Sequence, residues 1–118
     1  MNEHIAVKAD WKTQEMPIMH ARFTLERHFS PEGMETLRRG FIPQSMDDKW
    51  FMYMEGQTLY AHRSWTGHCI YMLTFREGSD VIDVTVNRDR EQYTCVSIDD
   101  DIQLLQLLLG CWSGEVER

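Results

Sequence analysis

The chain has 118 residues, 42% of them hydrophobic, and a formal net charge of −7. This length suffices for one domain with its own hydrophobic core, so we expect residues 1–118 to form a single domain. The acidic balance argues against nucleic acids and anionic membranes as partners, because both are bound through basic surfaces.

Two further features point to the cytoplasm. No apolar run approaches the ~20 residues that a membrane span needs, and the first residues lack the basic start and apolar core of a signal peptide. Cys69, Cys95 and Cys111 are an odd, widely spaced set, which is typical of free thiols in a reducing compartment. We therefore expect a cytoplasmic protein.

The N-terminal third predicts one strand and one short helix. Residues 1–17 alternate weakly and fit either a strand or a helical turn. Apolar and polar side chains alternate over Met19–Phe29, which is typical of a half-buried strand. A helix near 31–39 should follow, because Ser30 can cap it and Pro31 suits its first position.

Residues 49–88 are the stretch around which the rest of the chain is organised. Runs rich in aromatic and β-branched residues are separated by turns at Gly56, at Thr66-Gly67 and at residues 77–80, which predicts consecutive β-hairpins. Tyr93–Ile98 then resembles another strand, and a Leu-rich helix near 100–112 begins with acids that suit its dipole. The predicted fold class is α+β, an antiparallel β-meander of about five to six strands with these two helices.

The turns decide which side chains share a face of the sheet. If Thr66-Gly67 is a two-residue loop, His62 pairs with Tyr71, and if Gly78-Ser79 is the next loop, Phe75 pairs with Ile82. The face predicted as the core then contains Phe51, Tyr53, Tyr60, His62, Ser64, Cys69, Tyr71, Leu73, Phe75, Ile82, Val84 and Val86. The opposite face begins with an apolar strip of Trp50, Met52 and Met54. A slip of one residue at either turn would exchange the faces.

The hairpin tip from His62 to His68 holds the strongest group of polar side chains. Histidine can move protons near neutral pH, arginine can hold a phosphate or carboxylate, and tryptophan can stack on a base. The candidate ligand-binding residues are Lys49, Trp50, His62, Arg63, Ser64, Trp65 and His68. The register divides them, because His62 and Ser64 fall on one face and the rest of the tip on the other. The alternative interpretation is a turn whose polar groups satisfy one another and the backbone.

The sequence shows no motif for catalysis or for a metal. Cys69 has no identifiable oxyanion donor, and free cysteine is usually a small core residue. The spacing of the histidines and Cys69 matches no zinc pattern. Helix capping explains the acids from Asp99 to Asp101 better than a cation site does. We therefore predict no catalytic residue, no metal and no cofactor.

Two short runs, Asp48-Lys49-Trp50-Phe51 and His62-Arg63-Ser64-Trp65-Thr66-Gly67, resemble a segment of small bacterial proteins of unassigned function. The segment is also similar to one in proteins of the ADP-ribosylglycohydrolase and macro-domain type. The resemblance covers about residues 42–75, and this sequence lacks the acidic metal motifs of the glycohydrolases and the glycine-rich loops of macro domains. It implies an accessory domain near ADP-ribose chemistry and transfers no catalytic role.

Two functions remain, and whether the protein is an enzyme stays open. The first is a non-catalytic binding or interaction domain, which an exposed apolar strip from Trp50 to Met54 would favour. The second is a nucleotide- or ADP-ribose-linked site, binding or hydrolytic, at residues 62–67, which a pocket flanked by Arg63 and Trp65 would favour. If the apolar strip is uncovered, it also predicts a homodimer or another protein partner.

Overall fold

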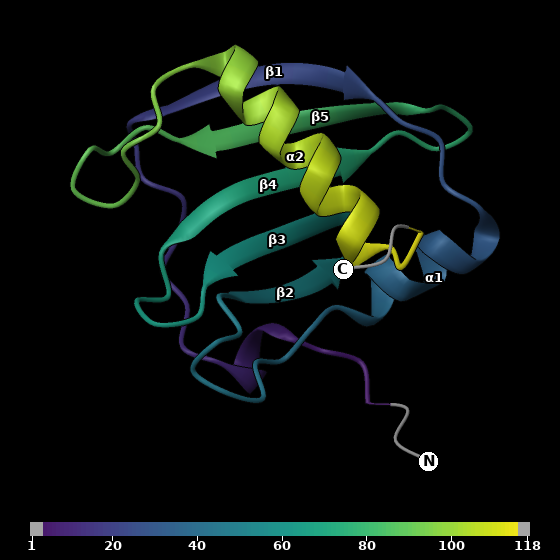
Figure 1. The fold of residues 1–118 in the computed structure, drawn as a ribbon, viewed down its shortest axis with the longest axis horizontal. Helices are drawn as coiled ribbons and strands as arrows, with labels where there is room; N and C mark the ends of the chain where they lie inside the picture. The colour runs from purple at the N-terminus through teal and green to yellow at the C-terminus, as the bar shows by residue number, and fades with distance from the viewer. Residues whose placement is uncertain (1–3, 116–118) are drawn as a thin grey trace.

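The computed structural model describes residues 4–115, which form an antiparallel sheet crossed by one long helix (Figure 1). The strands are β1 (His20–Glu26), β2 (Trp50–Glu55), β3 (Thr58–Arg63), β4 (Cys69–Phe75) and β5 (Val81–Asn87), in the sheet order β1-β5-β4-β3-β2. The helices are the 3-10 turn η1 (Lys8–Asp10), α1 (Pro31–Arg39) and α2 (Ile98–Trp112). The predicted α+β class with an antiparallel meander is confirmed. No helix among residues 4–115 is long and apolar enough to cross a membrane.

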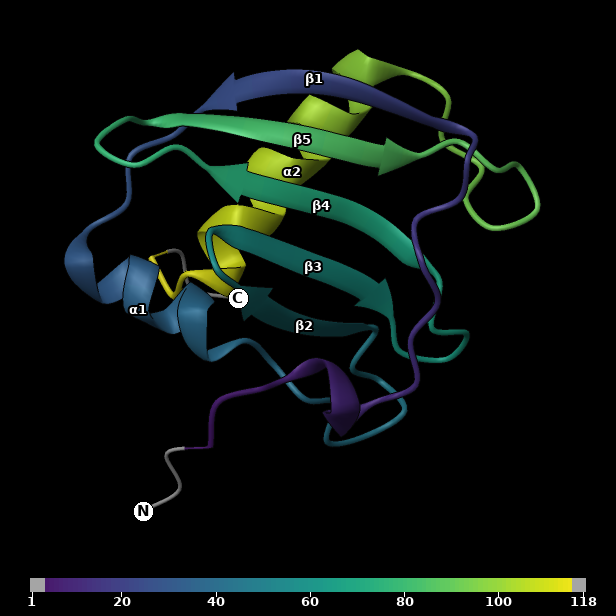
Figure 2. The same ribbon diagram turned by 180° about the vertical axis from the view of Figure 1, so that it is seen from behind.

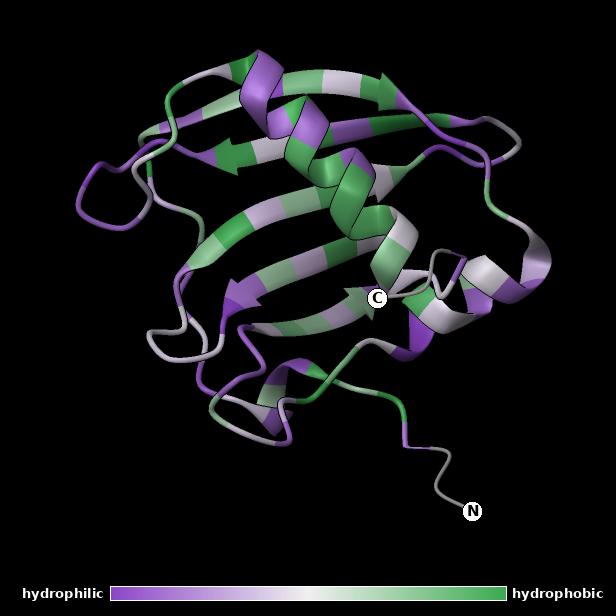
Figure 3. Cartoon of the chain, viewed as in Figure 1, coloured by the Kyte–Doolittle hydropathy of each residue, from purple (hydrophilic) through white to green (hydrophobic). Residues whose placement is uncertain are grey.

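The two faces of the sheet are covered differently. α2 lies diagonally across one face, and α1 lies beside the end of β2 (Figure 1). We call the face that α2 leaves uncovered the outer face. The N-terminal segment 4–16 lies near β2 and then passes the ends of β3 and β4 on its way to β1 (Figure 2). Hydrophobic residues are concentrated on α2 and the strands beneath it, and hydrophilic residues in the loops (Figure 3).

The helix ends follow the sequence signals. Ser30 Oγ accepts the backbone N–H of Gly33 at 3.0 Å at the start of α1, and Ser97 caps α2 in the same way. Gly40 ends α1 at a φ of +69°, where a β-carbon would collide with the carbonyl of Met52. The helix predicted near 31–39 is therefore confirmed with its caps.

The predicted register is right at the Gly78-Ser79 turn and wrong at the hairpin tip, where His62 pairs with Cys69 and not with Tyr71. Phe75 pairs with Ile82 as predicted. Tyr60, however, pairs with Met72 and not with Leu73. The predicted faces of β2 and β3 are therefore exchanged relative to those of β4 and β5.

The cause of the shift is a longer loop followed by a β-bulge. The chain reverses through residues 64–67, and the N–H of Gly67 donates to the carbonyl of Arg63 at 2.8 Å. Gly67 takes a φ of +82°, which favours glycine. Ile70 is left out of the pairing with β3, as the extra residue of a bulge is. No short-range sequence signal marks this bulge.

The core under α2 combines residues that the sequence had placed on opposite faces. It contains Met52, Leu59, Ala61, Tyr71, Leu73, Val84, Leu105 and Leu109. Phe51, Tyr53 and His62, which were predicted in this core, lie instead on the outer face, where Phe51 and Tyr53 form a second cluster with Ala6. That part of the prediction is wrong, and the one-residue shift is the physical reason.

The apolar strip on β2 is covered. The Trp50 ring lies 5.4 Å from the ring of Trp112 on α2, and Met52 is 5% exposed. Phe41 pairs with Met52 in an isolated bridge along the free edge of β2. The exposed strip that motivated the homodimer prediction therefore does not exist, and the homodimer stays a prediction without this support.

The strand predicted at Tyr93–Ile98 is wrong. Residues 93–97 are irregular, and α2 already begins at Ile98. Tyr93 is buried and its hydroxyl donates to Asp101 Oδ1 at 3.0 Å, whereas Val96 is 62% exposed. The segment is thus anchored by one side chain and not by a strand ladder.

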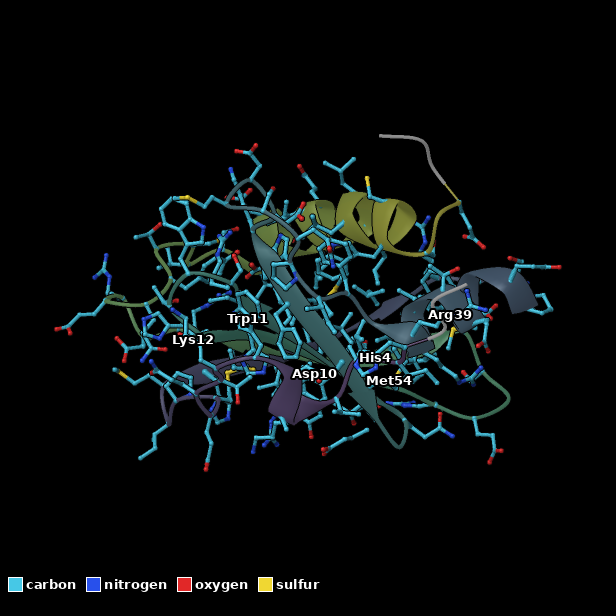
Figure 4. The ribbon with its side chains drawn as sticks, turned by 90° about the horizontal axis from the view of Figure 1, so that it is seen from below. His4, Asp10, Trp11, Lys12, Arg39 and Met54 are labelled. Atoms are coloured by element: carbon cyan, nitrogen blue, oxygen red, sulfur yellow. The ribbon has the colours of Figure 1, made fainter. Side chains whose placement is uncertain are left out.

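The N-terminal segment is fixed to the sheet by side chains. The indole N–H of Trp11 donates to the carbonyl of Ser64 at 2.8 Å, and its ring stacks on Phe51. His4 and Asp10 pair within the segment at 2.7 Å (Figure 4). Within the described residues the only regular element before β1 is η1, which answers the question left open for residues 1–17. Residues 1–3 lie outside the described part.

Candidate binding site at the β3–β4 hairpin

A cavity of about 370 Å³ lies beside the β3–β4 hairpin. It is lined by Lys49, Arg63, Trp65, Thr66, His68, Glu91 and Gln92. Four of the seven predicted ligand-binding residues are thus brought together: Lys49, Arg63, Trp65 and His68. Arg63 and Trp65 thus flank a pocket, which is the feature expected to favour a nucleotide- or ADP-ribose-linked site.

Arg63 is held in place by an aromatic ring. It pairs with Trp50 across β3 and β2, and its guanidinium carbon lies 4.6 Å from the centre of the Trp50 ring. A guanidinium over an indole face is attracted by the ring quadrupole. Trp50 therefore positions the arginine and lies outside the cavity lining.

The aromatic and imidazole groups of the cavity come from the loop. Trp65 is 63% exposed, and its indole N–H donates to the carbonyl of Met46 at 3.1 Å. The Nδ1 of His68 lies 3.2 Å from Gln14 Oε1, which can only accept, so Nδ1 carries the proton. Both rings thus have a fixed orientation, set by one hydrogen bond each.

His62 and Ser64 lie apart from this cavity and support the loop. The imidazole Nδ1 of His62 donates to the carbonyl of Gly67 at 2.9 Å. The hydroxyl of Ser64 donates to the carbonyl of Asp48 at 2.7 Å. For these two residues the alternative interpretation, polar groups that satisfy the turn, describes the structure.

Three lining residues are not among the seven candidates: Thr66 of the same loop, Glu91 and Gln92. Glu91 and Gln92 come from the loop after β5, which is distant in sequence from the hairpin. Asn87 holds this loop, because its amide donates to Gln92 Oε1 and its Oδ1 accepts the N–H of Asp89. The polar residues after β5 indicated a hydrogen-bonded loop. No local sequence pattern, however, indicates that this loop lies beside the hairpin tip.

Three observations bear on the chemistry of the described residues. Burial raises the pKa of the Cys69 thiol to about 12, and its side chain is 1% exposed, so it is no nucleophile. No group of three or more His, Cys, Asp or Glu side chains within residues 4–115 could hold a metal ion. Lys49 and Arg63 face one carboxylate, Glu91, so the formal charge of the lining is positive before His68 is counted.

A buried ion pair outside the cavity ties α2 to the sheet. Asp101 is fully buried and lies 2.6 Å from the guanidinium of Arg88. The hydroxyls of Tyr71 and Tyr93 both lie 3.0 Å from its Oδ1. Asp101 lies in the first turn of α2 as predicted, and its side chain makes this buried ion pair in addition. The sequence does not separate it from its exposed neighbours, because only the turn of the helix buries it.

No family model, no curated protein and no solved structure matches this chain. The fold and the cavity themselves define the class. It is a small α+β protein in which a long helix covers an antiparallel sheet and a basic cavity with an aromatic rim lies at a hairpin.

Proposed function

We propose that this chain is a non-catalytic binding domain whose hairpin cavity takes a small anionic ligand with a flat ring, such as a nucleotide or ADP-ribose. The convergence of Lys49, Arg63 and Trp65 on one cavity carries the proposal. These residues also belong to the segment that resembles proteins of ADP-ribose metabolism.

Each group has a role in such binding. The guanidinium of Arg63 can donate two parallel hydrogen bonds to two phosphate oxygens, and Lys49 adds a point charge. The exposed face of Trp65 can stack on a base. Glu91 can accept hydrogen bonds from sugar hydroxyls. A volume of about 370 Å³ lies within the usual range of ligand pockets.

The lining supports binding better than hydrolysis. Hydrolysis of a glycosidic or phosphate bond needs a base or nucleophile with a positioned partner. Glu91 is the single carboxylate of the lining, and His68 is bound through Nδ1 to a neutral amide. The proposal therefore stops at recognition.

A thermal-shift screen on the whole chain tests the proposal. The probes are AMP, ADP-ribose, adenosine and inorganic phosphate. A ligand at 100 times its Kd should raise the Tm by about 10 °C, since it adds about 2.7 kcal/mol and each kcal/mol shifts a domain of this size by about 4 °C. We expect the charged nucleotides to exceed both adenosine and phosphate, because only they use the cations and the indole together.

Two variants locate the effect. Lys49→Gln and Trp65→Ala change exposed side chains of the cavity, so the fold should survive both. Lys12→Gln is the matched control, because Lys12 is also exposed and lies outside this lining. Equal nucleotide shifts in the wild type, Lys49→Gln and Trp65→Ala would contradict the proposal.

A further inference from the structure

A second cavity, of about 420 Å³, lies between the N-terminal segment and the outer face of β2, β3 and β4. Its lining includes Lys8, Glu15, Tyr53, Glu55, Tyr60 and His62. It is separate from the hairpin cavity, with which it shares no lining residue. Figure 2 shows the N-terminal segment passing this side of the sheet.

His62 presents a buried hydrogen-bond acceptor without a donor. Its Nδ1 lies 2.9 Å from the carbonyl of Gly67, which can only accept, so Nδ1 carries the proton and Nε2 keeps a lone pair. The residue is 2% exposed, and Nε2 is buried with no hydrogen-bond partner. Burial lowers the pKa of His62, which keeps the ring neutral. A buried acceptor without a donor destabilises a fold, so a donor at this point would be stabilising.

The surroundings of the cavity favour positive charge. Tyr53 and Tyr60 stack with their ring centres 4.9 Å apart, and Tyr53 also stacks on His62 at 5.8 Å. Burial first, and then the nearby carboxylate of Glu55, raise the pKa of both tyrosines, so both phenols stay neutral. Glu15 and Glu55 against Lys8 give the lining one net negative charge, two acids against one base.

We propose that this cavity binds a small organic cation with a primary ammonium group. One ammonium N–H donates to Nε2 of His62, and the carboxylates of Glu15 and Glu55 match the charge. The carbon chain lies against the faces of Tyr53 and Tyr60, where cation–π attraction adds to hydrophobic contact.

The other ligand classes fit less well. An anion would meet the lone pair of Nε2 and two carboxylates, with Lys8 as the only cation of the lining. A metal ion lacks ligands, because no suitable group of three exists within residues 4–115. A covalent modifier would need Cys69, whose thiol is buried and protonated at neutral pH.

The cavity also joins two parts of the chain. Lys8 and Glu15 belong to the N-terminal segment, and the tyrosines and His62 belong to the sheet. The N–H of Gln14 donates to the carbonyl of Gly67 at 2.9 Å and is one attachment point of the segment. A bound cation should therefore slow the hydrogen exchange of the Gln14 amide.

The test is NMR titration of the whole ¹⁵N-labelled chain with n-butylamine, putrescine, n-butanol and butyrate. We expect both amines to shift the Nε2 resonance of His62 saturably and to protect the Gln14 amide. n-Butanol should bind more weakly, because it offers a neutral donor, and butyrate should leave Nε2 unchanged. No saturable Nε2 shift with either amine, or an equal response to butyrate, would overturn the proposal.

Variants separate this site from the hairpin cavity and from general surface charge. Glu55→Gln should weaken amine binding about threefold, the size of an exposed charge pair. Glu77→Gln is the matched control, because Glu77 is also an exposed acid beside a hairpin turn and lies outside the lining. Lys49→Gln and Trp65→Ala should leave amine binding unchanged. Equal weakening by Glu55→Gln and Glu77→Gln would show surface attraction alone and reject the site.

Discussion

The sharpest stability prediction concerns Asp101→Asn. Asp101 is fully buried. Its carboxylate accepts hydrogen bonds from the guanidinium of Arg88 at 2.6 Å and from the hydroxyls of Tyr71 and Tyr93 at 3.0 Å. The two tyrosine hydroxyls also lie 2.9 Å from each other. The two hydroxyls and Asp101 Oδ1 therefore make three short contacts, and the two hydroxyl protons can form hydrogen bonds in only two of them. Asparagine keeps the shape and one acceptor oxygen, but its NH₂ group adds donors where donors already converge.

The size of the loss follows from the burial of the pair. Removal of one partner of a buried ion pair costs about 3–5 kcal/mol, because the other charge is left uncompensated. The side chain of Arg88 is 15% exposed and can recover some hydration, so we expect the free energy of unfolding to fall by about 3 kcal/mol. That is a large share of the ~5–15 kcal/mol by which a domain is stable.

Urea unfolding measures this loss, with Asp99→Asn as the matched control. Asp99 lies in the same first turn of α2 and is exposed, so its change removes the same charge from the helix N-terminus. The control should lose only the ~0.3–1 kcal/mol of the helix dipole. If the two variants lost equal free energy of unfolding, the buried pair would not hold α2 to the sheet.

Three further predictions concern the fold. Gly67→Val should lose more stability than Gly78→Val. Both glycines have a positive φ, which costs a side chain such as valine ~1–2 kcal/mol. Of the two, only Gly67 lies so close to other backbone that an added β-carbon would meet the Lys12 carbonyl oxygen, at 3.0 Å. Equal losses in thermal melts would refute this close approach. Leu105→Ala should cost ~2–5 kcal/mol because Leu105 is fully buried, whereas Leu107→Ala, at 63% exposure, should melt like the parent; a matching loss in both would place α2 differently. The lowered pKa of His62 means that its contribution to stability is present above about pH 6.5 and is lost as the pH falls through the folded pKa. His62→Gln should therefore flatten the decline between pH 7.5 and pH 5, and unchanged steepness would show that another group causes it.

Local signals predicted the elements well. Ser30, Pro31 and Gly40 defined α1, and the glycine turns defined the hairpins, because caps and turns depend on a few neighbouring residues. The bulge at Ile70 could not be predicted, since it depends on how the tip loop packs under the N-terminal segment. This single residue moved Phe51 and Tyr53 from the predicted core to the outer face.

The site was predicted in part for the same reason. Lys49 precedes β2, Arg63 ends β3, and Trp65 and His68 lie in the loop after it, so sequence proximity indicated these four residues. Glu91 reaches the cavity only through the tertiary path of the loop after β5. The strand prediction at Tyr93–Ile98 was wrong because a buried tyrosine is typical of a strand. Here Tyr93 is buried and donates a hydrogen bond to Asp101 of α2.

The most direct test of ligand recognition at the hairpin is a titration of ADP-ribose followed through the indole N–H resonances of the four tryptophans. The Trp65 indole donates to the Met46 carbonyl beside the cavity, whereas Trp11 donates to Ser64 under the N-terminal segment. Ligand recognition at the hairpin predicts a saturable shift of the Trp65 resonance, with Trp11 and Trp112 unmoved, and a higher Kd in Lys49→Gln. A saturating titration that shifts Trp11 or Trp112 and leaves Trp65 in place, or no shift at all, would contradict it.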